Sequence, residues 1–158
     1  MQPAEALRRK LITIFQRKGK DGRNTRIFDH LDETQKEFLG THVALHKGEL
    51  PVIGSVESQR RWLLMTTARV IWCLKREPQM FPLTEIIRVS ADFEGLLTSG
   101  HGKLDVGELL VETLQEGKYI LPVEPGSPLI GVWNVLKHSA FLNRKIVREL
   151  VESAGDRS

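Results

Sequence analysis

Apolar residues near the start of the chain recur at helical spacing. They are Leu7, Leu11, Ile14 and Phe15, at successive intervals of four, three and one residue. Side chains spaced in this way share one face of an α-helix, and Pro3 just before them suits a helix start. The pattern predicts an amphipathic helix over residues 4–17. The residues 18–24 that follow are rich in glycine and charge, which predicts a loop and a candidate linker.

A second, short helix is predicted beyond this loop. Asp32 can cap the free backbone donors of a helix start, and Gln35, three residues later, can complete a capping box. Gly40 is typical of a helix end. The helix should therefore stop at Leu39.

From residue 41 the apolar positions alternate with polar ones, which is typical of β-strands. The strands are predicted near residues 41–46, 50–56, 60–67, 69–75, 78–83, 86–92, 106–114 and 117–123. Most connections between them are short, as at Thr67-Ala68 and Glu116-Gly117, so neighbouring strands should pair antiparallel as hairpins. The small polar residues of Gly95–Lys103 predict one longer loop.

The pattern returns to helical spacing near residue 127. Ser127 is a suitable N-cap, and Pro128 suits the first helical position. The apolar positions that follow are Leu129, Val132, Trp133, Leu136, Ala140 and Phe141. They predict an amphipathic helix with one face on the core. Asn143 is then expected to start a separate terminal helix that carries Ile146, Val147, Leu150 and Val151.

Composition bounds the size and class of the protein. The chain has 158 residues, of which 41% are hydrophobic and 27% charged, values typical of one globular domain. No run approaches the roughly 18 apolar residues of a membrane span, and the start of the chain lacks the features of a secretory signal. A cytoplasmic location is therefore expected. Cys73, the single cysteine, lies in an apolar predicted strand, which favours a buried thiol.

Charge is distributed unevenly along the chain. Residues 1–26 hold eight basic and two acidic residues, a local net charge of +6, whereas the whole chain carries +3. The basic residues are Arg8, Arg9, Lys10, Arg17, Lys18, Lys20, Arg23 and Arg26. The asymmetry indicates a basic helical extension over residues 1–40, a main domain over residues 41–153 and a frayed tail over residues 154–158.

Two stretches of the predicted strands have a distinctive order of packing and turn residues. In residues 61–72 an apolar strand ends in threonine, turns, and restarts with an arginine-aliphatic pair. Residues 80–89 contain an aliphatic-Pro-Leu-x-acid-Ile order, and Trp133 lies in the helix that follows the strands. These features resemble the pleckstrin-homology-like (PH-like) family, including its bacterial and GRAM-type members, over roughly residues 41–141. The resemblance implies an antiparallel β-barrel or sandwich of about seven strands closed by a C-terminal helix.

The resemblance also implies a function. Domains of this family are mostly non-catalytic modules that bind acidic lipid headgroups, peptides or proteins. Headgroup-binding members have a lysine and a spaced Arg-x-Arg in the first hairpin. Here Lys47 is followed only by the adjacent pair Arg60 and Arg61, whose side chains should point to opposite faces of a strand. We therefore expect both arginines to lie in solvent at a strand end.

The catalytic patterns that the sequence approaches are incomplete. Gly100–Lys103 resembles a phosphate-binding loop, but Leu97 replaces its first glycine and Leu104 its Ser or Thr. A cluster in the same predicted loop has the residue types of nucleophilic catalysis, namely Ser99, His101 and Asp105. Polar residues of this kind are common in any loop. The sequence predicts a protein that is not an enzyme.

Metal ligands are not predicted either. His42 and His46 would lie about 13 Å apart along a strand, too far to share one ion without further ligands. Glu108, Glu112 and Glu116 repeat every four residues, which on a strand indicates a solvated acidic face. We therefore expect neither a metal nor a cofactor.

Two functions remain as hypotheses. The first is an interaction module that binds a protein partner or a second copy of the chain. The second is a peripheral membrane adaptor whose basic N-terminal helix binds anionic lipid, provided that this helix projects from the domain. Nucleic acid is disfavoured because the basic segment lacks interleaved aromatic residues. The candidate binding residues are Arg8, Arg9, Lys10, Arg17, Lys18, Arg60 and Arg61.

Overall fold

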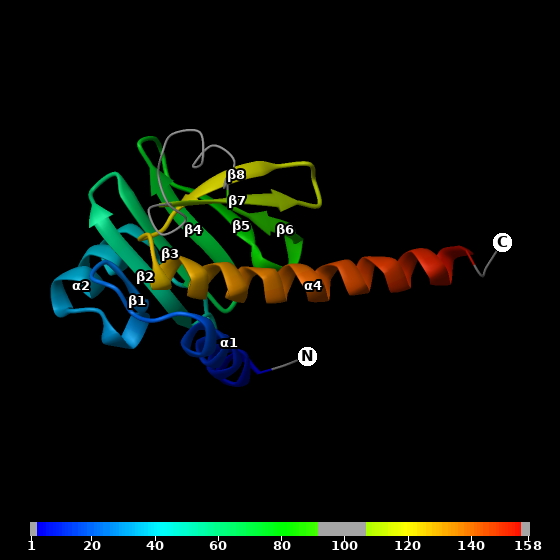
Figure 1. Cartoon of the computed structure of the whole chain (residues 1–158), viewed down its shortest axis with the longest axis horizontal. Coiled ribbons are helices and arrows are strands. Elements are labelled where there is room, and N and C mark those ends of the chain that lie inside the picture. The colour runs from blue at the N-terminus through cyan, green and yellow to red at the C-terminus, as the bar shows by residue number, and fades with distance from the viewer. Residues whose placement is uncertain (1–2, 92–106, 156–158) are drawn as a thin grey trace.

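The fold is described from a computed structural model, which defines residues 3–91 and 107–155 (Figure 1). The predicted loop Gly95–Lys103 and the cluster of Ser99, His101 and Asp105 lie outside the described residues. The described part of the chain forms two antiparallel sheets and three α-helices. It is a β-sandwich with helices, and the long C-terminal helix runs along one side of it.

The larger sheet has five antiparallel strands in the order of the chain. They are β1 (Thr25–Ile27), β2 (Pro51–Ser58), β3 (Arg61–Thr66), β4 (Arg69–Leu74) and β5 (Gln79–Pro82). Its central strand β3 is buried on both faces, since Leu63 and Met65 face one hydrophobic cluster while Trp62 and Leu64 face another. Burial on both sides explains why this strand is a continuous apolar run rather than an alternating one.

The smaller sheet has three antiparallel strands, β6 (Ile86–Ser90), β7 (Glu108–Thr113) and β8 (Lys118–Pro122). Within the described residues no strand ladder joins the two sheets, so they do not close into a barrel. Strand β8 lies against β3 and β4 of the larger sheet. The predicted strands from residue 50 onward are therefore all present, with ends that differ from the prediction by at most two residues.

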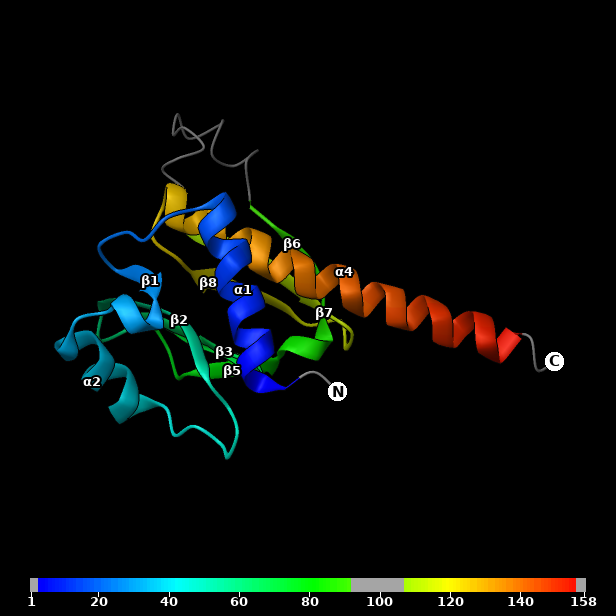
Figure 2. The ribbon, with the colours of Figure 1, turned by 90° about the horizontal axis from the view of Figure 1, so that it is seen from below.

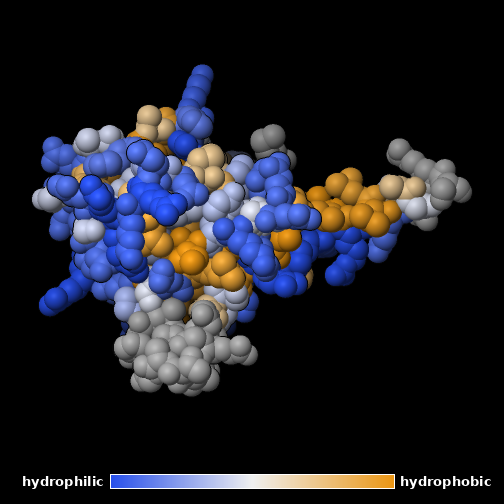
Figure 3. Space-filling view, turned by 90° about the horizontal axis from the view of Figure 1, so that it is seen from above, coloured by the Kyte–Doolittle hydropathy of each residue, from blue (hydrophilic) through white to orange (hydrophobic). Residues whose placement is uncertain are grey.

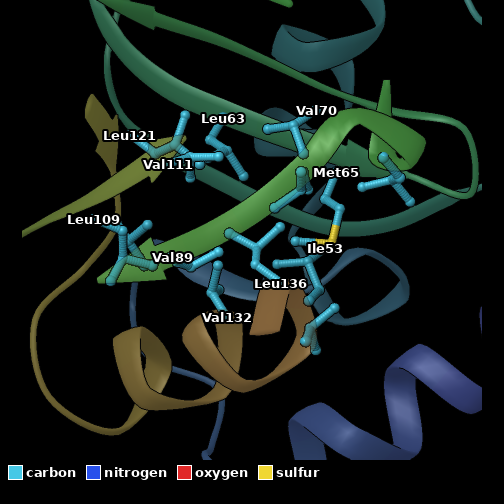
Figure 4. Close-up of a cluster of buried hydrophobic side chains, with 14 of the residues drawn as sticks. Ile53, Leu63, Met65, Val70, Val89, Leu109, Val111, Leu121, Val132 and Leu136 are labelled. Atoms are coloured by element: carbon cyan, nitrogen blue, oxygen red, sulfur yellow. The ribbon is translucent and has the colours of Figure 1, made fainter. Parts of the chain in front are cut away.

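The main core lies between the two sheets and the C-terminal helix. Figure 4 shows side chains from three directions meeting there, for example Met65 of the larger sheet, Val111 of the smaller sheet and Leu136 of the helix. All three are fully buried. A second, smaller cluster lies on the opposite face of the larger sheet and includes Trp62 and Leu39.

The C-terminal helix α4 (Ser127–Gly155) is continuous over 29 residues. The prediction of a separate helix starting at Asn143 is wrong. The Asn143 side chain is buried in mid-helix and donates hydrogen bonds to the carbonyl oxygens of Leu83, at 2.7 Å, and Ile86, at 2.8 Å. Its polar group therefore satisfies carbonyls of a neighbouring segment instead of capping a new helix. The helix also begins at Ser127 itself, after Gly126 with φ of 94°.

Helix α1 (Ala4–Lys18) confirms the first predicted helix and packs onto the domain. Its Leu11 and Phe15 side chains are buried in the main core, and the helix lies against α4 (Figure 2). The contact is close, because a Cβ atom at Gly131 of α4 would lie 2.6 Å from the Phe15 ring. Within the predicted extension, residues 3–40 therefore share a core with the rest of the described chain.

Helix α2 (Glu33–His42) has the predicted capping box, since Asp32 and Gln35 exchange both hydrogen bonds. The predicted end at Leu39 and the predicted strand at 41–46 are wrong. Helix α2 continues through Gly40, and His42 stacks on Phe38 with ring centroids 4.2 Å apart. A glycine stops a helix only where the backbone leaves helical geometry, and here that change comes at Val43.

Strand β1 was not predicted. It pairs with β2, and only three residues take part, so it carries little alternating pattern of its own. The short 3-10 turns η1 (Phe28–His30) and η2 (Leu83–Glu85) complete the described elements.

Candidate interaction surface

The end of α4 extends beyond both sheets (Figure 1). Every residue from Arg148 to Gly155 is exposed. We call these two turns the overhang. At 1.5 Å per residue, the overhang is about 12 Å long. An isolated helix of this length is marginal in water, so its order depends on the packed part of α4 and on whatever covers it.

An apolar stripe runs from the packed part of α4 into the overhang. Its residues are Ile146, Val147, Leu150 and Val151, which we call the α4 stripe. Ile146, Leu150 and Val151 are 54%, 65% and 66% exposed. Figure 3 shows hydrophobic surface along this end of the helix.

The α4 stripe continues the buried face of the helix. Leu136, Ala140 and Asn143 are buried, and Val147 and Leu150 follow Asn143 at intervals of four and three residues. Positions spaced in this way lie on one side of a helix. The face that holds α4 on the sheets therefore continues past the point where the sheets end.

A groove lies at the base of the overhang, between α4 and the smaller sheet. Its volume is about 420 Å³, and we call it the base groove. The residues that line it are Ile87, Arg88, Glu112, Leu114, Arg144, Val147 and Arg148. Val147 belongs to both the base groove and the α4 stripe, and Leu114 is 45% exposed. The two features therefore form one continuous apolar surface.

The surface has basic and acidic ends. The base groove holds three arginines against the single carboxylate of Glu112, which lies 3.6 Å from Arg88 Nε and 3.8 Å from Lys118 Nζ. The overhang beyond Arg148 holds Glu149 and Glu152 and no basic residue up to Gly155. An apolar surface bordered by charged residues is typical of a protein-binding site.

The predicted basic residues of α1 are only partly free to bind. Arg8 donates a hydrogen bond from Nε to the carbonyl oxygen of Pro51, at 3.0 Å, and pairs with Asp29. This arginine therefore ties α1 to the larger sheet. The side chains of the other four predicted residues are exposed, namely Arg9, Lys10, Arg17 and Lys18, but the apolar face of α1 is buried in the core.

Arg60 and Arg61 differ from each other. Arg60 is exposed in the turn between β2 and β3. Arg61 is not in solvent as expected, because it pairs with Glu57 and donates to the carbonyl oxygen of Gly107 at 2.6 Å. It also lines a hollow of about 320 Å³ that contains three carboxylates, those of Glu57, Glu108 and Glu124. An anionic ligand would meet negative charge there.

Two carboxylates, buried Glu49 and half-buried Glu124, hold the connections between elements, and sequence reasoning missed both. The side chain of Glu49 is 2% exposed and accepts hydrogen bonds from Arg69 Nε, at 2.8 Å, and Thr66 Oγ1, at 2.6 Å. Burial alone would raise the pKa of Glu49, but these hydrogen bonds outweigh burial and lower the pKa to about 2. The pair fastens the connection after α2 to the β3–β4 hairpin.

Glu124, just before α4, binds the N-terminal segment in a similar way. Its carboxylate accepts backbone hydrogen bonds from Arg23, Asn24 and Thr25 at 2.9–3.0 Å. Burial would raise the pKa of Glu124, but the three N–H donors lower it. The sequence gives little indication of this role. A glutamate before Pro125 and Gly126 does not indicate hydrogen-bond partners that lie a hundred residues away in the chain.

The described residues show no arrangement with evident catalytic or metal-binding chemistry. His42 lies on α2 and His46 in the connection to β2, so they do not share a strand, and no three metal-ligating side chains cluster within residues 3–91 and 107–155. Cys73 is buried as predicted, and burial raises the pKa of its thiol. A buried thiol with a raised pKa is a poor nucleophile.

The class of protein that the structure defines is a two-sheet antiparallel β-sandwich with packed helices. The chain matches no protein-family model, no curated protein and no solved structure. None of the described helices combines the length and the apolar character needed to cross a bilayer.

Proposed function

We propose that this protein is a non-catalytic, PH-like interaction module that binds protein through the α4 stripe and the base groove. The order of elements supports the PH-like assignment: four successive antiparallel strands β2 to β5, then three more, then the helix α4. The observation that carries the proposed function is the exposed apolar face of α4. Burying the remaining surface of Ile146, Leu150 and Val151 would contribute roughly 1–2 kcal/mol for each side chain.

A protein suits this surface better than a membrane does. The overhang carries Glu149 and Glu152 next to its apolar residues, and carboxylates are repelled by an anionic bilayer. Helix α1, which has the positive charge, would have to withdraw Leu11 and Phe15 from the core in order to insert. Membrane binding through α1 would therefore compete with folding.

The test compares two substitutions on the same helix. Leu150→Glu places a charge in the α4 stripe. Ile130→Glu places the same charge at a residue of α4 that is 37% exposed and lies twenty residues earlier, outside both the α4 stripe and the base groove. Both variants should keep the wild-type circular dichroism spectrum, because both side chains are exposed.

The readout is quantitative affinity capture from extracts of the source cells, with wild-type protein and both variants immobilised at equal density. We expect a set of proteins retained by the wild type and by Ile130→Glu but lost with Leu150→Glu. If the three proteins retain the same set, the α4 stripe is not a binding surface and the proposed function is wrong.

A further inference from the structure

We propose that the base groove and the α4 stripe receive an acidic, partly apolar peptide segment of a partner protein. The apolar side chains of the segment would cover the stripe, and its carboxylates would meet the arginines of the groove. This inference rests on the proposed function and specifies the chemistry of the partner. Three observations carry it: the charge of the groove, its position beside the stripe and its concave shape.

The negative charge of the base groove is already shared between two basic side chains. Glu112 is the one acidic residue among the described residues that line the groove. Its carboxylate oxygens lie 3.6 Å from Arg88 Nε and 3.8 Å from Lys118 Nζ, and both of these residues belong to the smaller sheet. Glu112 therefore offsets positive charge on the sheet side of the groove and leaves the α4 side positive.

The basic residues on the α4 side have no acidic partner. Arg144 donates a hydrogen bond from Nη1 to the carbonyl oxygen of Ile87 at 2.5 Å, and Arg148 is exposed. Neither arginine forms an ion pair within residues 3–91 and 107–155. The two arginines are four residues apart, and Lys145 lies three residues before Arg148, spacings at which like charges repel each other along a helix. Carboxylates of a ligand would offset this repulsion, so the groove favours an acidic partner.

The arginines border the apolar surface on one side. Val147, which lines the groove, lies between Arg144 and Arg148 in the sequence, and Val151 follows Arg148 after three residues. Positions three or four residues apart are neighbours on a helix, so Arg148 lies beside both Arg144 and Val151. A segment that covers the α4 stripe therefore meets the two arginines at the same time. Such a segment needs apolar side chains and carboxylates together.

The base groove is concave. Its volume of about 420 Å³ falls within the range of sites that enclose groups of a ligand. The smaller sheet contributes Ile87 and Leu114 to its walls, and α4 contributes Val147. A peptide side chain can enter a hollow of this size, whereas a bilayer presents a flat surface that would leave these walls uncovered. The shape therefore favours an acidic peptide over an anionic membrane.

Selection from a phage-displayed library of random peptides tests the chemistry of the partner. The immobilised full chain serves as the target, and Leu150→Glu serves for counter-selection, which removes peptides that bind elsewhere. We expect the enriched peptides to share apolar residues and a net negative charge. Enriched peptides that are neutral or basic, or a selection without any Leu150-dependent peptide, overturn the inference.

Two variants with the same change in net charge test the role of the groove. Arg148→Glu should weaken the binding of an enriched acidic peptide at least about tenfold, measured by fluorescence anisotropy of the labelled peptide. The matched control is Arg17→Glu, at an exposed residue of α1 that does not line the groove. The control should leave the affinity within about twofold of the wild type, because charges separated by more than a Debye length are screened at physiological salt. An equal loss in both variants would show that overall charge attracts the peptide, and the groove would then not be its site.

Exchange of the charges gives a complementary test. The same peptide with its acidic residues replaced by lysine should bind the wild type weakly. It should bind the double variant Arg144→Glu/Arg148→Glu more tightly than it binds the wild type, because the charges are again opposite. If the double variant does not prefer the lysine peptide, the carboxylates do not meet these arginines and the inference is wrong.

Vesicles of phosphatidylcholine and phosphatidylserine distinguish a peptide from a membrane. We expect no sedimentation of the protein with these vesicles at physiological salt. Sedimentation that Arg148→Glu abolishes would assign the groove to lipid headgroups and overturn the inference. The proposed function fails separately, because Leu150-dependent capture of proteins without a preference for acidic peptides leaves the binding surface in place but contradicts the acidic partner.

Discussion

Replacement of Gly131 by alanine tests how closely α1 and α4 pack. Gly131 is buried in α4, and a Cβ atom at this position would lie 2.6 Å from Cδ2 and 2.7 Å from Cε2 of the Phe15 ring. Carbon atoms in contact prefer about 3.5–4.0 Å, so the ring would have to move. Phe15 has no exposed surface, and its displacement would therefore disturb the surrounding core.

The expected loss follows from two opposing effects. Overpacking of a core costs about 1–3 kcal/mol, while exchange of glycine for alanine inside a helix gains up to about 1 kcal/mol. Gly131→Ala should therefore lower the free energy of unfolding by about 1–2 kcal/mol. The control is Gly40→Ala in α2, where an added Cβ atom meets nothing within 4 Å. Gly40→Ala should raise the free energy of unfolding by about 0.5–1 kcal/mol.

Urea unfolding followed by tryptophan fluorescence measures both changes. We expect the free energy of unfolding to fall with Gly131→Ala and to rise with Gly40→Ala, although the chemical substitution is the same. Phe15→Leu added to Gly131→Ala should recover part of the lost free energy, because leucine lacks the ring atoms that clash. If Gly131→Ala is as stabilising as Gly40→Ala, α1 does not pack on α4 at this point and the docked position of the N-terminal helix is wrong.

Three further predictions concern the polar contacts and α1. Glu49→Gln should lower the free energy of unfolding by about 3 kcal/mol at neutral pH, because folding lowers the pKa of Glu49 from 4.5 to about 2. This stability is present above the unfolded pKa and is lost as the pH falls through 4.5 toward 2. The free energies of unfolding of wild type and variant, measured with urea, should therefore converge at low pH. A difference in free energy that stays constant with pH would contradict the Glu49–Arg69 pairing. Asn143→Ala should destabilise by about 2 kcal/mol in the same assay, since two buried carbonyls lose their donor, whereas Asn134→Ala, which only loses a bond within its own helix, should be nearly neutral. Vesicles rich in anionic lipid should not sediment the protein at physiological salt; sedimentation that Arg9→Glu abolishes would instead support the membrane adaptor.

Much of the fold could be predicted because it depends on local pattern. The strands from residue 50 onward are bounded by turn residues and alternate or run apolar, and the capping box at Asp32 is a short-range signal. Local pattern fails where a distant partner decides the structure. Strand β1 has three residues, and it forms because Ser55 and Glu124 bind Thr25 from far along the chain.

The candidate surface was less predictable than the fold. The sequence predicted binding through basic residues of α1 and through Arg60 and Arg61, but two of these arginines, Arg8 and Arg61, form hydrogen bonds within the fold. The apolar residues of the α4 stripe were recognised as one face of a helix. Their spacing could not show that the sheets end before the helix does.

Asn143 lies close to the point where α4 passes the end of the sheets. A polar residue in an apolar helical pattern looks like the start of a new helix, and the sequence carries no sign of the two carbonyl groups, of Leu83 and Ile86, that bind it. It is the last buried residue of α4. Beyond the half-buried Val147 the helix keeps its apolar face, but no sheet covers that face. The hydrogen bonds of Asn143 hold α4 in a fixed direction at this point, so the overhang presents its stripe from a rigid base. Because the packed part of α4 already fixes the start of the overhang, a partner that orders the overhang costs less conformational entropy than ordering a separate helix of this length would, and the smaller cost favours association.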